Sequence, residues 1–408
     1  MGIRFAYQPA PAMNNSATQP ASLPGAPLPR SKFISEFEGL RGLLAAWVVF
    51  GHILLFSGYT YQEGWFGILF SPVLGVYAFM MLSGFVISAA LDQRPATWLA
   101  FMSRRFFRLF PTYLLCLGLA IALFTMSVQV SSSPALSTFG AENLERLADV
   151  EANYGTYLAA DMTLLQCLMP RGWFPFAHES FLPPTWSLTI EWLFYMVAPL
   201  LFWILRRKKW LGAASLIGFV GLVYCFESQL TLINRSFHLG NVFHFITGIA
   251  SYYLWKHLPE NLQRRHWQAA FWLALAGGLA LLNLPYKIWF CTMALILYPR
   301  FHANSLPVLE WAKRVLNSKP LQFLGRTSYV TYLLHWIVIE LVLFWLVNSF
   351  PDWRPSRLLL AIICTVAVYP ITYLISDLVH RYLEIPCIKI PKIWRQAPAA
   401  GSTKQPVV

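Results

Sequence analysis

Long apolar segments recur along this chain, and they constrain its fold more than any other feature of the sequence. About ten of them are long enough, or nearly so, to cross the roughly 30 Å hydrocarbon layer of a membrane as a helix. In lipid every backbone polar group must be satisfied within the structure, which favours helices. We place the segments at residues 38–58, 66–91, 109–130, 185–205, 211–226, 239–257, 268–283, 286–299, 327–350 and 358–382.

The composition supports the same class. Only 12% of the 408 residues are charged and 57% are hydrophobic, whereas about a quarter of the residues of soluble domains are charged. These numbers disfavour a large soluble protein with a buried core. The predicted fold class is an all-α, polytopic membrane protein with about ten transmembrane helices.

Lys and Arg are distributed unequally between the connections. Counting from a cytoplasmic N-terminus, the inward connections and the tail 386–408 hold 20 of them, and the outward connections hold 6. The positive-inside rule therefore predicts an N-in, C-in topology with an even number of spans and one long outer loop at 131–184. The net charge of +13 then reflects topology, and we expect no nucleic-acid partner.

The two ends of the chain differ from its middle. Residues 1–32 and 391–408 are rich in Pro, Ala, Ser and other small or polar residues, so we expect disordered cytoplasmic tails around one transmembrane domain at 33–390. The first tail lacks the apolar core of a signal peptide. The six cysteines are scattered without a CxxC motif, so the sequence predicts neither a disulfide framework nor a metal site.

Ionisable residues inside apolar segments indicate function by default. Arg41 and His52 are eleven residues apart, about three helical turns and about 16 Å along one helix face. An arginine at the cytoplasmic end could hold an anionic group, and an imidazole near mid-membrane could transfer protons near neutral pH. Alternatively, the arginine extends to the membrane surface and the histidine binds a neighbouring helix.

Basic residues also precede the third apolar segment. Arg105 and Arg108 in "SRRFFRLFP" share a helix face, and guanidinium pairs suit phosphate because they bind it bidentately. Ordinary positive-inside flanking would explain them equally well. At the end of the last segment we expect Arg381 and Glu384 to pair locally, in a structural role.

Two further polar stripes follow helical spacing. Ser187, Glu191 and Tyr195 are four residues apart and line one face; a buried carboxylate there needs partners and could orient a histidine or a hydroxyl, or simply join two helices. A second stripe holds Tyr332 and His335. It also includes Ser328 and Glu340, and for Glu340 we expect a polar contact between helices.

The long connection 131–184 ends in "RGWFPFAHESFLPPTW". Trp173, Phe174, Phe176 and Trp186 could offer flat faces to a sugar, with His178 and Glu179 nearby. They could equally form an aromatic belt at the membrane surface.

Together these motifs resemble those of the acyltransferase 3 family of membrane proteins. The resemblance spans residues 38–386. Three features depart from the family pattern: Glu38 stands where Asp is usual, Trp-Leu follows Glu191, and Ile385 replaces a basic residue. The matching positions, in chain order, are Arg41 and His52; the segment "FMMLSGFVIS" at 79–88; Arg105, Arg108 and Pro111; Trp186, Ser187, Leu188, Glu191, Phe194 and Tyr195; Ser328, Tyr329, Tyr332, Leu333 and His335; and Glu384 and Pro386.

The resemblance implies an integral membrane O-acyltransferase, in a bacterial cytoplasmic (inner) membrane, that moves an acyl group, commonly acetyl, from cytoplasmic acyl-CoA to a hydroxyl of a surface or periplasmic carbohydrate. The implied partners are acyl-CoA, a glycan or lipid-linked sugar, and the lipid bilayer, with no permanently bound cofactor and no metal. The implied sites are catalytic His52, Glu191 and Arg41; CoA-binding Arg41, Arg105 and Arg108; and substrate-binding Trp173, Trp186, Ser187, Tyr195, Tyr332 and His335.

We expect one aqueous passage in which the thioester and the sugar meet at His52. His52 would either deprotonate the acceptor hydroxyl or first accept the acyl group itself. Glu191 would orient His52 or the acceptor, and Tyr195 or Tyr332 would support the oxyanion. Two other classes stay open: a proton-coupled transporter of a small anion or sugar, and a non-catalytic scaffold.

Overall fold

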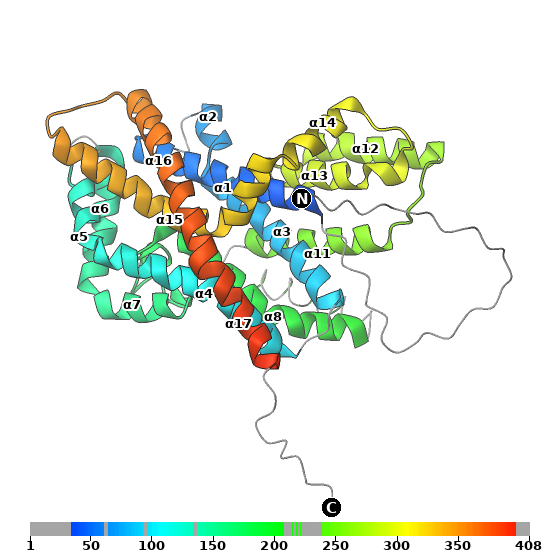
Figure 1. Ribbon diagram of the computed structural model, residues 1–408, viewed down its shortest axis with the longest axis horizontal. Coiled ribbons are helices and arrows are strands. Elements are labelled where there is room, and N and C mark those ends of the chain that lie inside the picture. Colours follow the sequence, from blue (N-terminus) through cyan, green and yellow to red (C-terminus); the bar gives the residue numbers. More distant parts are fainter. Residues whose placement is uncertain are drawn as a thin grey trace, which may run out of the picture. The chain divides into compact units, whose positions relative to one another are not determined.

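The computed structural model describes residues 34–60, 64–93, 97–133, 137–207 and 239–396, together with residues 214, 218, 221 and 225. All regular secondary structure in these residues is helical (Figure 1). The expected tail 1–32 lies outside them, as does most of the expected span 211–226. The helices are α1 (Ser35–Phe56), α2 (Gly64–Leu69), α3 (Pro72–Gln93), α4 (Trp98–Ala122), α5 (Phe124–Ser131), α6 (Ser137–Ala152), α7 (Tyr154–Met162), α8 (Trp186–Arg207), α11 (Leu239–His257), α12 (Arg265–Leu281), α13 (Leu284–Phe301), α14 (Pro307–Leu316), α15 (Lys319–Ser349), α16 (Arg357–Val379) and α17 (Ile385–Gln396).

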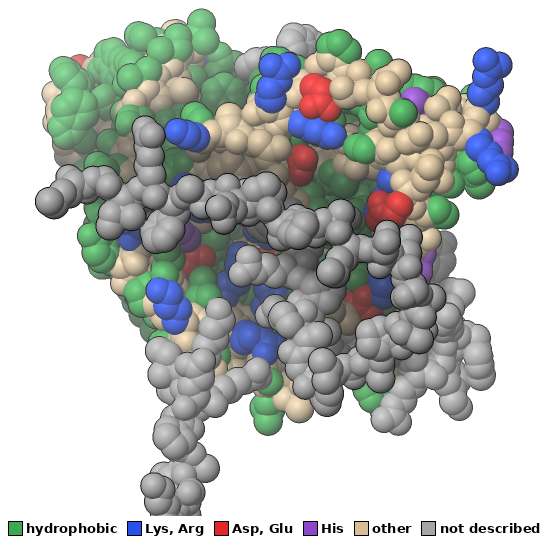
Figure 2. Space-filling model, turned by 45° about the vertical axis from the view of Figure 1, so that its right-hand side comes forward, with side chains coloured by type: hydrophobic (Ala, Val, Ile, Leu, Met, Phe, Trp, Pro, Cys, Tyr) green, Lys and Arg blue, Asp and Glu red, His purple; other side chains and the backbone are tan. Residues whose placement is uncertain are grey.

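Six helices of the described part are long and apolar enough to cross a membrane: Ser35–Phe56, Pro72–Gln93, Trp98–Ala122, Pro183–Ile204, Lys319–Ser349 and Arg357–Pro391. The helices α11, α12 and α13 form where spans are expected but do not meet these criteria. Figure 2 shows hydrophobic side chains gathered at the upper left of the face in view. Side chains such as Leu281 and Val366 are 85% and 71% exposed, which suits contact with lipid.

Two of the helix boundaries that differ from the expected spans have a clear local cause. The segment expected at 66–91 is interrupted before Pro72, which begins α3, because proline fits the first turn of a helix and cannot continue one. The segment expected at 109–130 begins much earlier, at Trp98, where Thr97 caps α4 by accepting a hydrogen bond from the Ala100 amide. Residues 105 and 108 therefore lie inside α4 rather than before it.

Glycines allow α1 and α15 to pack closely. A Cβ atom added to Gly325 would lie 2.0 Å from the Glu38 carbonyl oxygen, and one added to Gly42 would lie 2.7 Å from the Leu321 carbonyl oxygen. Small residues at such crossings let helix backbones approach each other. The two helices lie together in Figure 1, and their contact places the second half of α1 against the middle of α15.

The last membrane helix contains a π-helical turn. The turn η5 (His380–Glu384) joins α16 to α17, and such turns often occur at functional sites. The expected pairing of Arg381 with Glu384 is wrong: Arg381 pairs with Asp377 at 2.7 Å, and Glu384 with His380 at 2.7 Å. Both pairs are four residues apart, the spacing that aligns side chains on a helix. The helix α17 also extends to Gln396, past the domain end expected at residue 390.

The described part of the connection between α5 and α8 is built from short helices and turns. It contains α6, α7 and three short turns, η2 (Gln166–Leu168), η3 (Ala177–Glu179) and η4 (Pro183–Thr185). Its centre is the side chain of Asp161, which is 1% exposed and accepts a hydrogen bond from Ser180 Oγ at 2.5 Å. Burial raises the pKa of Asp161 to about 7, although the Ser180 hydrogen bond and the charge of Arg146 act in the opposite direction.

Substituting Gly325 tests the packing of α1 against α15. We expect Gly325→Ala to lower the melting temperature of the purified protein, because the new methyl group must displace the backbone at Glu38; overpacking of this kind costs about 1–3 kcal/mol. Gly277→Ala in α12 is the matched control, since its Cβ meets nothing within 4 Å. Equal melting temperatures for the two variants would contradict the close packing.

The pH dependence of stability tests Asp161. An acid whose folded pKa is raised favours the folded state while it is protonated, so its contribution is lost as the pH rises from about 4, where the unfolded group ionises, to about 7. We expect Asp161→Asn to raise the melting temperature at pH 8 and to leave it nearly unchanged at pH 4. The exposed Asp352→Asn should change neither value, and an Asp161 variant with the wild-type pH dependence would refute the assignment.

Candidate active site

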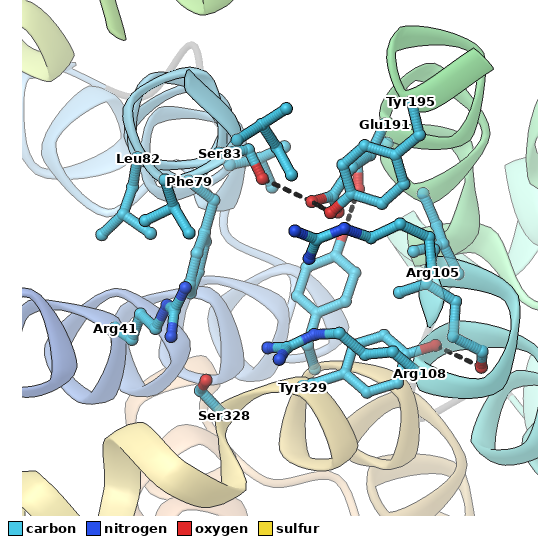
Figure 3. Close-up of a pocket in the computed structure, with 17 residues that line it drawn as sticks. Arg41, Phe79, Leu82, Ser83, Arg105, Arg108, Glu191, Tyr195, Ser328 and Tyr329 are labelled. Atoms are coloured by element: carbon cyan, nitrogen blue, oxygen red, sulfur yellow. Dashed lines mark hydrogen bonds between the residues drawn. The ribbon is translucent and has the colours of Figure 1, made fainter. Parts of the chain in front are cut away.

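Three arginines from two helices line one pocket. The pocket has an empty volume of about 830 Å³, and its wall includes Arg41 from α1 and Arg105 and Arg108 from α4 (Figure 3). In Figure 3 these side chains enter the pocket from opposite sides. We call it the arginine pocket. Its described wall carries three arginines but a single carboxylate, that of Glu191, so the wall has a net positive charge suited to an anion.

The arginines are held by nearby partners. Arg41 pairs with Glu38 at 3.3 Å, and the Arg105 guanidinium lies 5.3 Å from the ring centre of Phe101 and 5.1 Å from that of Tyr195. Among the carboxylates, Glu384 has the strongest electrostatic interaction with Arg108. These contacts fix the direction of the guanidinium groups, which bind phosphate bidentately when they are held in place.

Glu191 lies in the arginine pocket. Its carboxylate accepts hydrogen bonds from Ser83 of α3 and from Tyr195 one turn further along α8 (Figure 3). Of the two roles expected for Glu191, orienting His52 or orienting the acceptor, the structure shows no direct contact for the first, since the described partners of Glu191 are on α3 and α8 and those of His52 are Val48 and His335. Glu191 joins two helices of the pocket and offsets part of its positive charge.

A second pocket contains the histidine. Its empty volume is about 1610 Å³, and we call it the histidine pocket. His52 of α1 and Trp336 of α15 line it together with Trp186. The remaining wall is largely contributed by the connection between α5 and α8, including Glu142, Glu145, Arg146, Arg171, Phe176, His178 and Glu179. Hydroxyl-rich molecules suit such a wall, since it combines aromatic faces with both acidic and basic side chains.

His52 is paired with a second histidine. His52 Nδ1 lies 3.0 Å from His335 Nε2 and 3.0 Å from the carbonyl oxygen of Val48. His335 is fully buried, and its Nδ1 lies 3.2 Å from the carbonyl oxygen of Thr331. The ring of Trp336 meets His52 edge to face, with 5.4 Å between centroids.

A thin polar layer lies between the two pockets. Tyr332 and Ser187 line the arginine pocket, and Pro184 lines the histidine pocket. The Tyr332 hydroxyl donates to the Pro184 carbonyl at 2.6 Å and lies 2.7 Å from the Ser187 hydroxyl. Among the described pockets the arginines therefore line one and His52 the other, and Tyr332 and Ser187 lie where their walls meet. The expected single passage stays a prediction.

The structure brings most of the predicted site residues together, in two groups. Trp173 is 77% exposed and lines neither described pocket, and buried His335 reaches the site through His52. Glu340 accepts from Ser127 of α5 at 2.7 Å, which is the helix contact expected for it. The arginine pocket receives Arg41, Arg105, Arg108, Ser187, Glu191, Tyr195 and Tyr332, and the histidine pocket receives His52 and Trp186.

Some residues of the site were not anticipated. Ser83 is one of two serines in the "FMMLSGFVIS" segment, and a serine in an apolar run is a signal for a buried hydrogen bond. Trp336 directly follows His335, but helical spacing alone does not show that it faces His52. Arg146 is 4% exposed and donates to the carbonyls of Glu179 and Ser180, so it shapes the wall of the histidine pocket.

Comparison with known proteins relates the chain to acyltransferases. The sequence model of the acyltransferase domain family (Acyl_transf_3) matches residues 34–377. A protein of Komagataeibacter xylinus named as the membrane-bound transacylase BcsY is 27% identical over 77% of this chain and 76% of its own length. The acyltransferase MdmB of Streptomyces mycarofaciens is 24% identical over 91% of this chain and 95% of its own length. No solved structure matches the chain significantly.

The family match covers α1 to α16 and therefore both pockets. It groups the chain with enzymes rather than with transporters or scaffolds, and the six apolar helices agree with the membrane-bound character of a relative. The chain therefore belongs to the acyltransferase 3 family and is an enzyme that transfers acyl groups.

Proposed function

We propose that the protein transfers an acetyl group from acetyl-CoA, bound at the arginine pocket, to a hydroxyl of a carbohydrate, bound at the histidine pocket. The observation that carries this proposal is the arrangement of the two pockets, which meet at the hydroxyl groups of Tyr332 and Ser187. One pocket suits an anion, and the other presents an imidazole to a polar molecule. Acetyl-CoA and a sugar are the donor and acceptor that match these two chemistries.

The donor is assigned from charge and reach. CoA carries several phosphates, for which Arg41, Arg105 and Arg108 would provide bidentate partners. In the predicted topology most Lys and Arg residues lie on the cytoplasmic side, so the arginine pocket faces the cytoplasm in this proposal. His52 lies about 16 Å further along α1 than Arg41, a distance that suits the pantetheine arm of CoA.

The acceptor is assigned from the wall of the histidine pocket. Trp186 and Trp336 provide flat faces, and the connection between α5 and α8 provides carboxylates and guanidinium groups. This pocket is larger than the arginine pocket, so it has room for more than one sugar ring. A glycan or a lipid-linked sugar would reach it from the opposite side of the membrane.

The transfer can follow two routes. In the first, His52 removes the proton of the acceptor hydroxyl while its oxygen attacks the thioester carbonyl; the C–S bond breaks and the CoA thiolate takes the proton from the imidazolium. In the second, His52 attacks the thioester first, the C–S bond breaks and CoA leaves as the thiolate; the acyl-imidazolium then passes the acyl group to the hydroxyl, whose proton ends on the thiolate. Both routes use the same nitrogen of His52.

Of the two tyrosines, Tyr332 is the better oxyanion donor. The Tyr195 hydroxyl is bonded to Glu191 in the arginine pocket, whereas the Tyr332 hydroxyl lies in the layer that a thioester must pass to reach His52. An incoming carbonyl oxygen could replace Pro184 as its acceptor. Exchanging one neutral hydrogen bond for another costs about 1 kcal/mol or less, so the layer can open at small cost.

Replacing His52 tests the chemical step. We expect His52→Gln to lower CoA release from acetyl-CoA in the presence of a panel of glycans by about 10²–10⁴-fold, the usual contribution of a general base. The thiol of released CoA is measured on protein reconstituted into vesicles. His266→Gln, exposed at the start of α12, is the control. Undiminished turnover in the His52 variant would refute the mechanism, and an acylated His52 peptide found with donor alone would select the second route.

Replacing Arg105 or Arg108 tests the donor site. We expect each Ala variant to raise the KM for acetyl-CoA about ten- to hundredfold, since a hydrogen bond to a charged group contributes about 1.5–3 kcal/mol. The KM for S-acetylpantetheine, which lacks the phosphates, should not change. Arg326→Ala, exposed on α15, should affect neither donor. A loss that is equal for both donors would show that the arginines do not bind phosphate.

A further inference from the structure

The chemistry proposed for His52 requires one particular form of its ring. A neutral imidazole has one nitrogen with a proton, which donates, and one with a lone pair, which accepts. Only the nitrogen with the lone pair can remove a proton or attack a carbonyl. Because a free neutral histidine prefers the form with the proton on Nε2, the form with the proton on Nδ1 has to be held by its surroundings.

The partners of His335 define its own form. Its Nδ1 lies 3.2 Å from the carbonyl oxygen of Thr331, and a carbonyl oxygen only accepts. Nδ1 of His335 therefore carries the proton and donates it to this oxygen. In the neutral ring, Nε2 of His335 is then left with a lone pair, directed at Nδ1 of His52 at 3.0 Å.

The form of His52 follows in the same way. Its Nδ1 faces two acceptors, the lone pair of His335 Nε2 and the carbonyl oxygen of Val48, each at 3.0 Å. The opposite assignment would point a lone pair of His52 at the Val48 oxygen and leave a lone pair of His335 facing Thr331. Nδ1 of His52 thus carries the proton, and Nε2 has the lone pair.

We propose that His335 is a positioning residue that holds His52 in the Nδ1–H form, so that Nε2 is the reactive nitrogen presented to the histidine pocket. This inference rests on the proposed function, which requires a reactive His52. The Val48 oxygen also accepts the helical hydrogen bond of the His52 amide, so it is a shared acceptor, whereas Nε2 of His335 is dedicated to His52. Nε2 of His52 has no hydrogen-bond partner among the described residues, and the ring lines the histidine pocket.

His335 does not act as a proton relay. Its second nitrogen is directed at the carbonyl of Thr331, which cannot take the proton further, and the side chain is fully buried. Its contribution is therefore the position and the form of the His52 ring. Trp336 assists from the next position: its indole donates to Glu340 at 3.1 Å and packs edge to face on His52, which limits rotation of the ring.

Two variants separate this role from a structural one. A Gln side chain places its carbonyl oxygen near the position of histidine Nε2, so His335→Gln keeps an acceptor for His52. An Asn side chain ends near the position of Nδ1, so His335→Asn keeps the contact with Thr331 and loses the one with His52. Both variants keep a polar side chain in the core, and their melting temperatures show whether they fold equally well.

The form of the ring is measured directly by nitrogen NMR. The full-length protein is labelled with ¹⁵N-histidine and reconstituted at pH 7.5, and the His52 signals are identified by their loss in His52→Gln. We expect a protonated Nδ1 and an unprotonated Nε2 in the wild type and in His335→Gln, and a mixture of both forms in His335→Asn. Protonated Nε2 in the wild type, or the wild-type signals in His335→Asn, would overturn the proposal.

Kinetics provide the second readout. With acetyl-CoA and any glycan that supports turnover, we expect His335→Asn to lower kcat about ten- to hundredfold, as is usual when the residue that orients a reactive histidine is lost, with little change in the KM for acetyl-CoA. His335→Gln should stay close to wild type. Equal kcat values for the two variants would refute the role. If no glycan supports turnover, the proposed function fails while the NMR result still tests the form of His52.

Discussion

The close approach of α1 and α15 is the contact on which both pockets depend. Gly42 and Gly325 let the two backbones meet without side chains between them, and this approach sets His52 beside His335. The same helix α1 presents Arg41 to the arginine pocket, and α15 supplies Tyr332 to the layer between the pockets. A shift of α1 along α15 would separate His52 from His335 and would also displace Tyr332. The packing of these two backbones therefore couples the two pockets.

Arginine side chains inside the apolar helices are stabilised by neighbouring carboxylates and aromatic rings. An isolated guanidinium in hydrocarbon is costly, but Arg41 pairs with Glu38, and Arg105 lies over Phe101 and Tyr195. Removing one member of such a set leaves another charge without compensation. The arginine pocket therefore costs free energy to form within a membrane, and an anionic ligand would compensate part of its positive charge.

The sequence predicted most of the helices and most of the residues that line the two pockets. It did not predict which of these residues lie together. Hydropathy located most apolar helices, and helical spacing placed Ser187, Glu191 and Tyr195 on one stripe. Spacing indicates which side chains share a face of one helix, but it does not say which helix that face meets. Glu191, expected to orient either His52 or the acceptor, lies among the arginines, while the partner of His52 is His335, a residue 283 positions further along the chain. Such pairings are set by tertiary packing.

The division into two pockets has a physical reason in a membrane. A continuous aqueous passage lined by arginines and a histidine would conduct water and small ions, and would expose a thioester to hydrolysis. The hydroxyls of Tyr332 and Ser187 and the carbonyl of Pro184 form hydrogen bonds among themselves where the two described pockets meet. Each such bond contributes only about 1 kcal/mol, so the layer separates the pockets at rest and yields to a ligand that brings its own acceptor. A carbonyl group entering from the arginine pocket is such a ligand, and it would arrive beside His52.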